Sequence, residues 1–332
     1  MVEEKLFDLT KDQEEHAIDL FNKSLVIDGL NASIMYKGYF EKLRQGGVTA
    51  INYTIAMNQD ISETMKRFCT LYRYFESCKD LIMLATKTDD VIKAKKENKT
   101  AFFIGFQNVD PLEGLLGMID IYYKLGLRIV QLTYHFRNIV GDGGGERIDA
   151  GLSKFGIALV EKLNKSRILI DLAHVGPKTS LETIELSKYP CVFSHSNARA
   201  LVDTYQNHTD EEIQALAEKG GVIGITGFPR LLKKPDCSIN DMLDHIDYVV
   251  NLVGVNHVGI GSDFAEGWAE SLERRVRLLE IDGKIYTWPR GFETVTKFVN
   301  IAKGLVSRGY SDQEIKKILG ENFLRVFKTV FG

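Results

Sequence analysis

The sequence has 332 residues, of which 44% are hydrophobic and 26% are charged, values that are typical of globular proteins. The formal net charge is −3, and 42 basic and 45 acidic residues are intermixed, so we expect no basic face for nucleic acid. The acidic N-terminus lacks the features of a secretory signal, and the apolar runs are far shorter than the roughly 20 residues of a membrane span. We therefore expect a cytoplasmic protein with no nucleic-acid or membrane partner.

Short apolar runs rich in β-branched residues alternate with helical patterns along the chain. Such alternation is typical of βα units around a parallel sheet. A ninth apolar run, at 81–86, is interpreted as an accessory strand that precedes the third barrel strand. The pattern predicts an α/β fold, a (β/α)8 barrel of the TIM type. The eight predicted barrel strands are 24–30, 47–55, 100–106, 127–134, 167–174, 190–195, 221–227 and 257–264.

Helical segments between the strands show apolar residues at three- and four-residue spacing. Segments 153–166 and 209–221 begin with a serine or threonine suited to an N-cap. Proline is scarce and no Pro/Ser-rich linker divides the chain, which argues against two independent halves. We predict one barrel domain over residues 1–332, with a short N-terminal helix and a C-terminal helical extension.

The last part of the chain and one irregular stretch carry further expectations. Segment 308–332 predicts an amphipathic helix, and we expect its Phe323, Val326 and Phe327 to pack against the barrel exterior. The irregular stretch from Trp268 to Arg290 is interpreted as an active-site loop or a subunit contact.

Two histidines and an aspartate end predicted strands. In a TIM-type barrel, side chains at the C-terminal strand ends converge on the catalytic face. His174 ends the fifth predicted strand, His195 ends the sixth, and Asp263 lies at the end of the eighth. Neutral imidazoles with a carboxylate favour Zn²⁺ or a similar ion, so this set predicts a site for one divalent metal. A lone strand-end histidine is more often structural, and a strand-end aspartate often caps a helix, but the combination favours a functional role.

Other groups near these residues have simpler interpretations. Asp171 and the serines on both sides of His195 could orient the imidazole rings through hydrogen bonds. The glycine run GDGGGE at 141–146 lacks nucleotide-binding spacing and is interpreted as a mobile loop beside the pocket.

Several motifs together resemble one known family. The chain is similar to the renal or membrane dipeptidases, zinc metallopeptidases related to the amidohydrolase barrels. This resemblance implies a barrel that holds two zinc ions bridged by a glutamate and that hydrolyses the amide of a dipeptide. The motifs that carry it, in chain order, are VIDGLN (26–31), FIGFQN (103–108), LGLRIVQLTY (125–134), LIDLAHVG (169–176), VFSHSNARAL (192–201), HVGIGSDF (257–264) and GENFLRVF (320–327).

The sequence departs from the family pattern at the first metal. Leu30 and Ala32 stand where the family has a His-x-Asp pair, and neither side chain can bind a cation. The bridging glutamate falls on Gln107, a neutral donor that cannot stabilise two close cations. The ligands of the second metal remain as His174 and His195. The resemblance therefore implies one zinc ion or none, with Gln107 or Asp263 completing the shell.

The resemblance also assigns substrate and catalytic positions. Asp263 matches the carboxylate beside the hydrolytic water, and we interpret it as the base. Tyr134 stands where the family has a histidine that polarises the substrate carbonyl, and we expect the next residue, His135, to point elsewhere. Gln206 replaces the arginine that grips the substrate carboxylate, and Asn207 beside it is taken as a further substrate-binding residue. Arg137, Arg199 and Arg230 are the alternatives for that carboxylate.

These observations predict a metal-dependent hydrolase that cleaves a dipeptide or related small amide, with one metal ion rather than two. An alternative is a catalytically silent barrel that acts as a binding module, which the loss of the first metal site favours. A third is metal-independent chemistry with Asp263 and a histidine as base and acid. A homodimer is expected from the resemblance alone.

Overall fold

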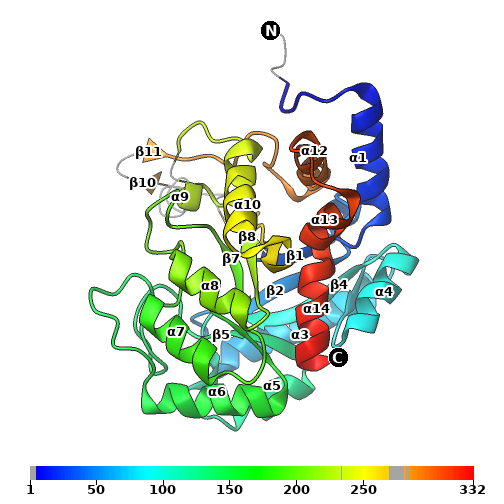
Figure 1. Cartoon of the computed structure of the whole chain (residues 1–332). Coiled ribbons are helices and arrows are strands. Elements are labelled where there is room, and N and C mark those ends of the chain that lie inside the picture. Colours follow the sequence, from blue (N-terminus) through cyan, green and yellow to red (C-terminus); the bar gives the residue numbers. More distant parts are fainter. Residues whose placement is uncertain (1–4, 233, 269–279, 282–283) are drawn as a thin grey trace.

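The structure is a computed structural model that describes residues 5–232, 234–268, 280–281 and 284–332 (Figure 1). Most of the stretch from Trp268 to Arg290, predicted to be an active-site loop or a subunit contact, therefore lies outside the described residues.

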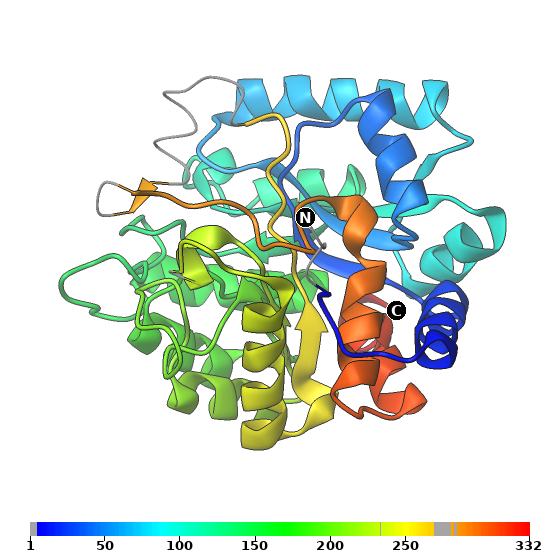
Figure 2. The same ribbon diagram turned by 90° about the horizontal axis from the view of Figure 1, so that it is seen from above.

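Eight parallel strands of the described chain close into a barrel, and helices surround them (Figure 2). Neighbours follow the order β2, β1, β9, β8, β7, β6, β5, β4, and pairing between β2 and β4 closes the ring. This confirms the predicted TIM-type barrel. The strands are β1 (Ile27–Asn31), β2 (Ala50–Ala56), β4 (Thr100–Phe106), β5 (Leu127–Gln131), β6 (Leu169–Asp171), β7 (Val192–Ser196), β8 (Val222–Ile225) and β9 (Val258–Ile260).

A ninth parallel strand, β3 (Ile82–Leu84), lies outside the ring. It pairs with the first three residues of β4, from Thr100 to Phe102, whereas β5 pairs with β4 from Ile104 onward. β3 and β5 therefore pair with the same edge of β4, β3 with the N-terminal part of that edge and β5 with the C-terminal part. The predicted accessory strand at 81–86 is thus confirmed.

The described helices cover the outside of the barrel, and their starts follow the predicted caps. The Ser153 hydroxyl accepts from the Gly156 amide, and Thr209 forms a capping box with Glu212. None of these helices has the length and apolar character needed to cross a bilayer. They are α1 (Lys11–Lys23), α2 (Lys37–Gln45), α3 (Ile61–Ser77), α4 (Thr88–Glu97), α5 (Met118–Lys124), α6 (Lys154–Ser166), α7 (Pro177–Leu186), α8 (Asp210–Glu218), α9 (Pro229–Leu232), α10 (Ile239–Val253), α12 (Val299–Ser307), α13 (Asp312–Lys316) and α14 (Asn322–Phe331).

Short elements complete the described chain. The N-terminal helix α1 packs beside α12 and α13, so helices from early and late in the sequence lie together on one side of the barrel (Figure 1). A small antiparallel pair, β10 (Glu280–Ile281) and β11 (Lys284–Ile285), stands apart from the main sheet. The remaining turns are the 3₁₀ turns η1 (Asp110–Leu112), η2 (Val255–His257) and η3 (Val295–Lys297), and the π-helical turn η4 (Lys317–Glu321).

The C-terminal helix α14 lies differently from its prediction. Its Phe323, Val326 and Phe327 are buried, but they join a cluster with residues from β1, β4, β6 and β8 instead of packing on the barrel exterior. The helix crosses the N-terminal ends of the strands. There the Arg167 guanidinium, just before β6, donates to the Thr329 carbonyl. An amphipathic pattern predicts that one face of a helix is buried, but it does not identify the residues that bury it. In this structure α14 closes the barrel at the N-terminal ends of the strands.

Candidate functional site

Three strand ends at the opposite face of the barrel carry an unusual backbone. His135, His174 and Asp263 come after β5, β6 and β9, and their φ angles are +65°, +65° and +56°. They are half of the six non-glycine residues with positive φ in the described chain. Such conformations cost about 1–3 kcal/mol each and gather at functional sites. The backbone strain therefore marks the face at which the sequence placed the site.

His174 and His195 meet directly. Their Nε2 atoms lie 2.8 Å apart, and both side chains are buried. Behind His195, the Ser194 hydroxyl lies 2.7 Å from Nδ1 of the ring and donates over 2.5 Å to Oδ2 of Asp171. Because a hydroxyl has one hydrogen, Nδ1 of His195 must donate to Ser194 when Asp171 is ionised. In this tautomer Nε2 of His195 carries no proton and accepts a hydrogen bond from Nε2 of His174.

The expectation that His135 points elsewhere is wrong. Its Nδ1 lies 3.0 Å from Nδ1 of His174, and Nε2 of Gln206 lies 3.3 Å from the same atom. The ring of Tyr134 is also close to His174, at 4.8 Å between centroids. The expectation assumed strand alternation, but β5 ends at Gln131, so the alternation no longer applies at Tyr134 and His135.

The three imidazoles are neutral at ordinary pH. Burial and, to a smaller extent, the neighbouring His135 lower the pKa of His195 to about 3. Burial also lowers the pKa of His135 to about 4, with Arg230 contributing. The pKa of His174 falls well below its usual value, again through burial first and then through the adjacent rings. Neutral rings keep the lone pairs that a metal ion needs.

Asp263 and Tyr134 share one electrostatic environment. Burial and the nearby Asp28 carboxylate raise the pKa of Asp263 well above its usual range, and no described residue hydrogen-bonds its carboxylate. Asp28 itself is buried in β1 and accepts from the amide and hydroxyl of Ser262, yet burial still raises its pKa to about 6. Burial and the charge of Asp263 raise the pKa of Tyr134, so its phenol stays protonated.

The glycine run at 141–146 lies beside this site, as predicted, but it is packed closely against the site instead of forming a mobile loop, and this packing explains its composition. A Cβ on Gly143 would lie 2.4 Å from the carbonyl oxygen of His135, and one on Gly144 would lie 2.3 Å from that of Tyr205. The Gly144 amide donates to the His174 carbonyl at 2.8 Å. The glycines therefore allow this loop to pack directly against the backbone of the site.

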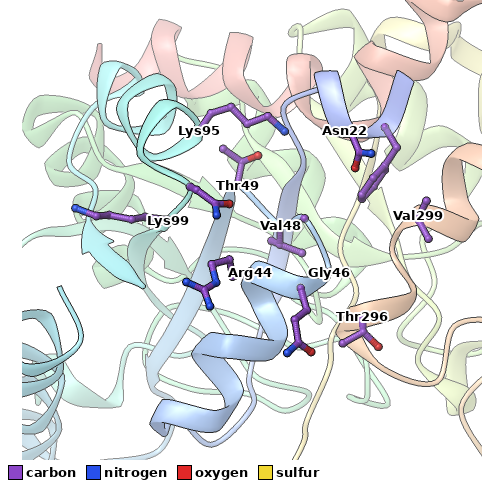
Figure 3. A pocket seen from close by; sticks show the side chains of 13 residues that line it. Asn22, Arg44, Gly46, Val48, Thr49, Lys95, Lys99, Thr296 and Val299 are labelled. Carbon is purple, nitrogen blue, oxygen red and sulfur yellow. The ribbon is translucent and has the colours of Figure 1, made fainter. Parts of the chain in front are cut away.

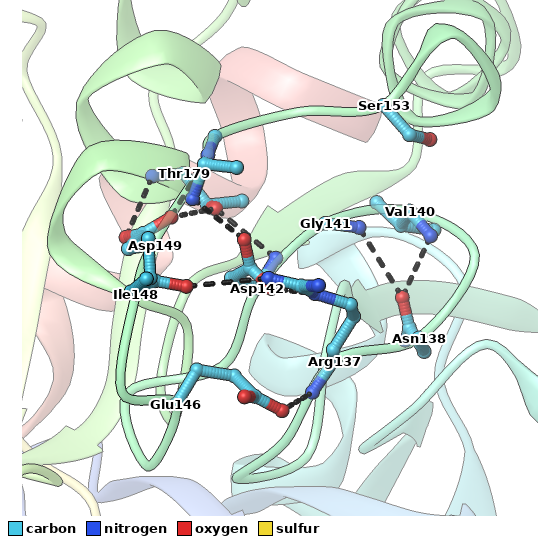
Figure 4. Close-up of polar contacts among 12 residues, drawn as sticks. Arg137, Asn138, Val140, Gly141, Asp142, Glu146, Ile148, Asp149, Ser153 and Thr179 are labelled. Carbon is cyan, nitrogen blue, oxygen red and sulfur yellow. Dashed lines mark hydrogen bonds and ion pairs between the residues drawn. The ribbon is translucent and has the colours of Figure 1, made fainter.

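Side chains on the same loop hold it in place (Figure 4). Asp142 pairs with Arg137 and accepts from the Ala150 amide, and Asp149 accepts from the hydroxyl of Thr179 at 2.8 Å. These contacts join the segment after β5 to the start of α7. The loop therefore fixes Tyr134 and His135, which lie at its beginning.

Other predicted residues lie apart from the histidine pair. Nε2 of Gln107 donates to the Thr54 hydroxyl at 2.9 Å, and no described contact joins Gln107 to His174 or His195. Asn207 is buried, and its amide donates to the carbonyls of Val202 and Leu231, so both of its hydrogens are used within the fold. In the described residues, no three His, Cys, Asp or Glu side chains form a group that could hold a metal ion.

The three arginines considered for a substrate carboxylate differ in their partners. Arg137 pairs with Asp142, and Arg199 donates to the Thr204 carbonyl and lies near Asp203. The Arg230 guanidinium, on α9, has no ion pair or hydrogen bond with any described residue, yet its charge acts on Tyr134 and His135. Arg230 is therefore the arginine of the three that is available at the site.

Comparisons with known proteins identify the family of this chain. A family model described as membrane dipeptidase, peptidase family M19, matches residues 13–278 and 280–331. Dipeptidase tcpJ of Claviceps purpurea (strain 20.1) is 30% identical over 272 residues, which are 81% of this chain and 60% of that protein. Dipeptidase verJ of Clonostachys rogersoniana is 28% identical over 277 residues, 83% of this chain and 67% of that protein. The chain thus spans between 56% and 67% of the length of the curated relatives that it matches.

Solved structures show the same fold. An amidohydrolase from Pseudomonas aeruginosa superposes with a TM-score of 0.89 at 37% identity, covering 95% of this chain and 99% of that one. A metallo peptidase from Rhodobacter sphaeroides, liganded with a phosphinate mimic of the dipeptide L-Ala-D-Ala, has a TM-score of 0.80 at 19% identity, covering 93% and 100%. The likeness to the second structure supports the fold alone. With a family model that matches most of its length, the chain belongs to the membrane dipeptidase family.

Proposed function

We propose that this protein is a metal-dependent hydrolase that cleaves a dipeptide or a related small amide, and that it works with one zinc ion. The observation that carries the proposal is the meeting of two imidazole nitrogens, Nε2 of His174 and Nε2 of His195, at 2.8 Å on the face where barrel enzymes place their chemistry. Membership of the dipeptidase family supports the reaction class.

The donors that are present fit one ion. The Asp171–Ser194 relay fixes the tautomer in which His195 offers its Nε2 lone pair, an arrangement that orients histidine ligands in many metal sites. Neutral imidazoles suit zinc, and the histidine pair would supply two of its ligands, with water completing the shell.

The donors do not fit a second ion. Leu30 and Ala32, at the positions that the resemblance assigns to its ligands, are apolar and buried. Gln107 is neutral and its amide nitrogen donates to Thr54, so it adds no negative charge between two cations. We therefore propose a site for one ion.

Chemistry at the site would combine the ion with groups of the chain. A divalent cation supplies Lewis-acid polarisation of the scissile amide carbonyl and lowers the pKa of water. Asp263 takes a proton from the attacking water and passes it to the leaving amine, because its carboxylate is not committed to any described hydrogen bond and burial raises its pKa, which makes it a stronger base. The protonated phenol of Tyr134 donates a hydrogen bond to the substrate carbonyl.

Arg230 is proposed to bind the carboxylate of the substrate. Gln206 has no charge, and its amide faces His174, so it cannot form an ion pair with a carboxylate. The loop that carries Gln206 is tied to α9 because the Asn207 amide donates to the carbonyl of Leu231, the residue after Arg230. Arg230 therefore stands beside Gln206, the position where the resemblance implies an arginine, and its guanidinium, which has no partner among the described residues, is suited to a carboxylate.

Hydrolysis assays test the proposed activity. The zinc-loaded protein should be screened against dipeptides, N-acyl amino acids and cyclic amides, with Asp263→Asn as the control variant. Zinc-dependent turnover that the substitution abolishes would support the proposal. Zinc binding without turnover of any of these amides would instead favour the silent-barrel alternative.

A further inference from the structure

A cavity of about 450 Å³ opens at the N-terminal ends of the strands, on the face of the barrel opposite the histidines (Figure 3). Its wall is formed by the ends of α1, α2 and α4 and by the residues that lead into β2, and the segment at Thr296 and Val299 closes one side. The cavity has the size of ordinary small-molecule sites. Nothing in the proposed hydrolase uses it.

The charged residues that line this cavity are all basic. Three of its residues, Arg44, Lys95 and Lys99, are basic, and none is acidic. Lys99 pairs with Glu97 at 2.6 Å, and its ammonium points away from the other labelled side chains in Figure 3. Arg44 and Lys95 make no ion pair or side-chain hydrogen bond with any described residue. The cavity therefore holds two cations whose charge no described carboxylate balances.

Of these two cations, Lys95 is the better placed to contact an anion in the cavity. It is half-buried, and burial lowers the pKa of its ammonium, which means that the fold disfavours this charge when nothing compensates it. Figure 3 shows its side chain reaching over Thr49 toward Asn22. The buried Thr49 hydroxyl accepts from the Val26 amide, so its own hydrogen remains available to an acceptor in the cavity.

The floor of the cavity is shaped by close backbone packing. A Cβ on Gly46 would lie 2.2 Å from the Val295 carbonyl oxygen, and Gly47, at φ +69°, packs against the ring of Phe21. Both glycines are therefore needed for α2 to turn into β2 at this place. A cavity built in this way exists before any ligand arrives, which lowers the cost of binding.

A different explanation for the basic residues must be weighed. Lys95 and Arg44 lie in the last turns of α4 and α2, where cations stabilise the helix dipole. Each helix C-terminus carries only about half a negative elementary charge, however. The two helix ends together therefore compensate about one of the two cations in the cavity. Lys96, also in the last turn of α4 but exposed and outside the cavity lining, provides the matched comparison.

From the cavity, its two cations that no described carboxylate balances and the available hydroxyl of Thr49, we propose that this face binds a small polyanion bearing phosphate or carboxylate groups. Arg44 and Lys95 would hold the charged groups, and Thr49 and the amide of Asn98 would donate to the remaining oxygens. Because the cavity lies away from the histidines, binding there acts on the stability of the barrel and does not supply a catalytic group.

Isothermal titration of the full chain with pyrophosphate and with citrate, at constant ionic strength, tests this proposal. The titrations are repeated with His174→Ala, so that chelation at the opposite face is not counted. We expect saturable 1:1 binding that this substitution leaves unchanged. The preferred probe tells whether phosphate or carboxylate groups are recognised.

Matched lysine variants decide whether the cavity is the site. Lys95→Met should weaken binding by about tenfold or more, as the loss of a charge-assisted hydrogen bond does, whereas Lys96→Met should leave it unchanged. Arg44→Met should act like Lys95→Met. The proposal is overturned if neither probe binds saturably, or if Lys95→Met and Lys96→Met weaken binding equally.

Discussion

Asp171 reaches the ring of His195 through Ser194, whose hydroxyl lies 2.5 Å from the Asp171 carboxylate and 2.7 Å from Nδ1 of the imidazole. All three side chains are buried, so the relay is shielded from water. It holds His195 in the tautomer that directs an unprotonated Nε2 at His174. The metal affinity of the proposed site should therefore depend on a serine that does not touch the ion.

Ser194→Ala removes this relay. Groups that orient a histidine ligand change metal affinity by about 10–100-fold, so we expect zinc to bind more weakly by that factor. A competition titration with a chromophoric chelator measures the change. Ser180→Ala is the control, because the Ser180 hydroxyl is buried on α7 without a hydrogen-bond partner among the described residues. Equal affinities of the two variants for zinc would contradict the role given to Ser194.

Asp263→Asn removes the proposed base. General-base catalysis contributes about 10²–10⁴-fold, so kcat should fall by that factor while the zinc content stays the same. Steady-state kinetics and metal analysis of the same preparation give both values. Unchanged turnover would exclude Asp263 as the base, and a loss of zinc in parallel would make it a ligand instead.

Arg230→Met tests the proposed contact with the substrate carboxylate. A charge-assisted hydrogen bond contributes about 1.5–3 kcal/mol, so kcat/KM for a dipeptide with a free C-terminus should fall by about 10–100-fold. The same dipeptide with an amidated C-terminus lacks the charge and should be cleaved equally by both proteins. If the variant loses activity on both substrates to the same extent, Arg230 has another role.

Gly29→Ala should destabilise the barrel. A Cβ at Gly29 in β1 would lie 2.5 Å from the Ser194 carbonyl oxygen and 2.6 Å from the ring of Phe323. Overpacking of this kind costs about 1–3 kcal/mol in the free energy of unfolding, which urea denaturation measures. Gly117→Ala meets no atom within 4 Å and serves as the control. Equal stability of the two variants would mean that β1 shifts freely, against the packing described.

The sequence predicts the barrel well because strand runs and helical spacing are local patterns. The eight strands, the accessory strand at 81–86 and the caps at Ser153 and Thr209 all follow from residues close together in the chain. The position of α14 does not follow from such local patterns. Its apolar face fits either the outside or the floor of a barrel, and only contacts with distant strands decide between them.

The same limit applies to the site. His174 and His195 are predictable because each ends a strand, and parallel strand ends converge. The contact of His135 with His174 depends on a backbone at φ +65° just beyond β5, which strand alternation does not predict. The free guanidinium of Arg230 is likewise visible only once the partners of Arg137 and Arg199 are known. Such contacts arise from loops whose conformation is set by tertiary packing.

Metal analysis of protein purified without chelator tests the proposed one-ion site most directly. We expect close to one zinc ion per chain, with the ion lost in both His174→Ala and His195→Ala and the fold retained by circular dichroism. Two ions per chain, or no bound metal after incubation with excess zinc, would contradict a site built on the paired Nε2 atoms of His174 and His195.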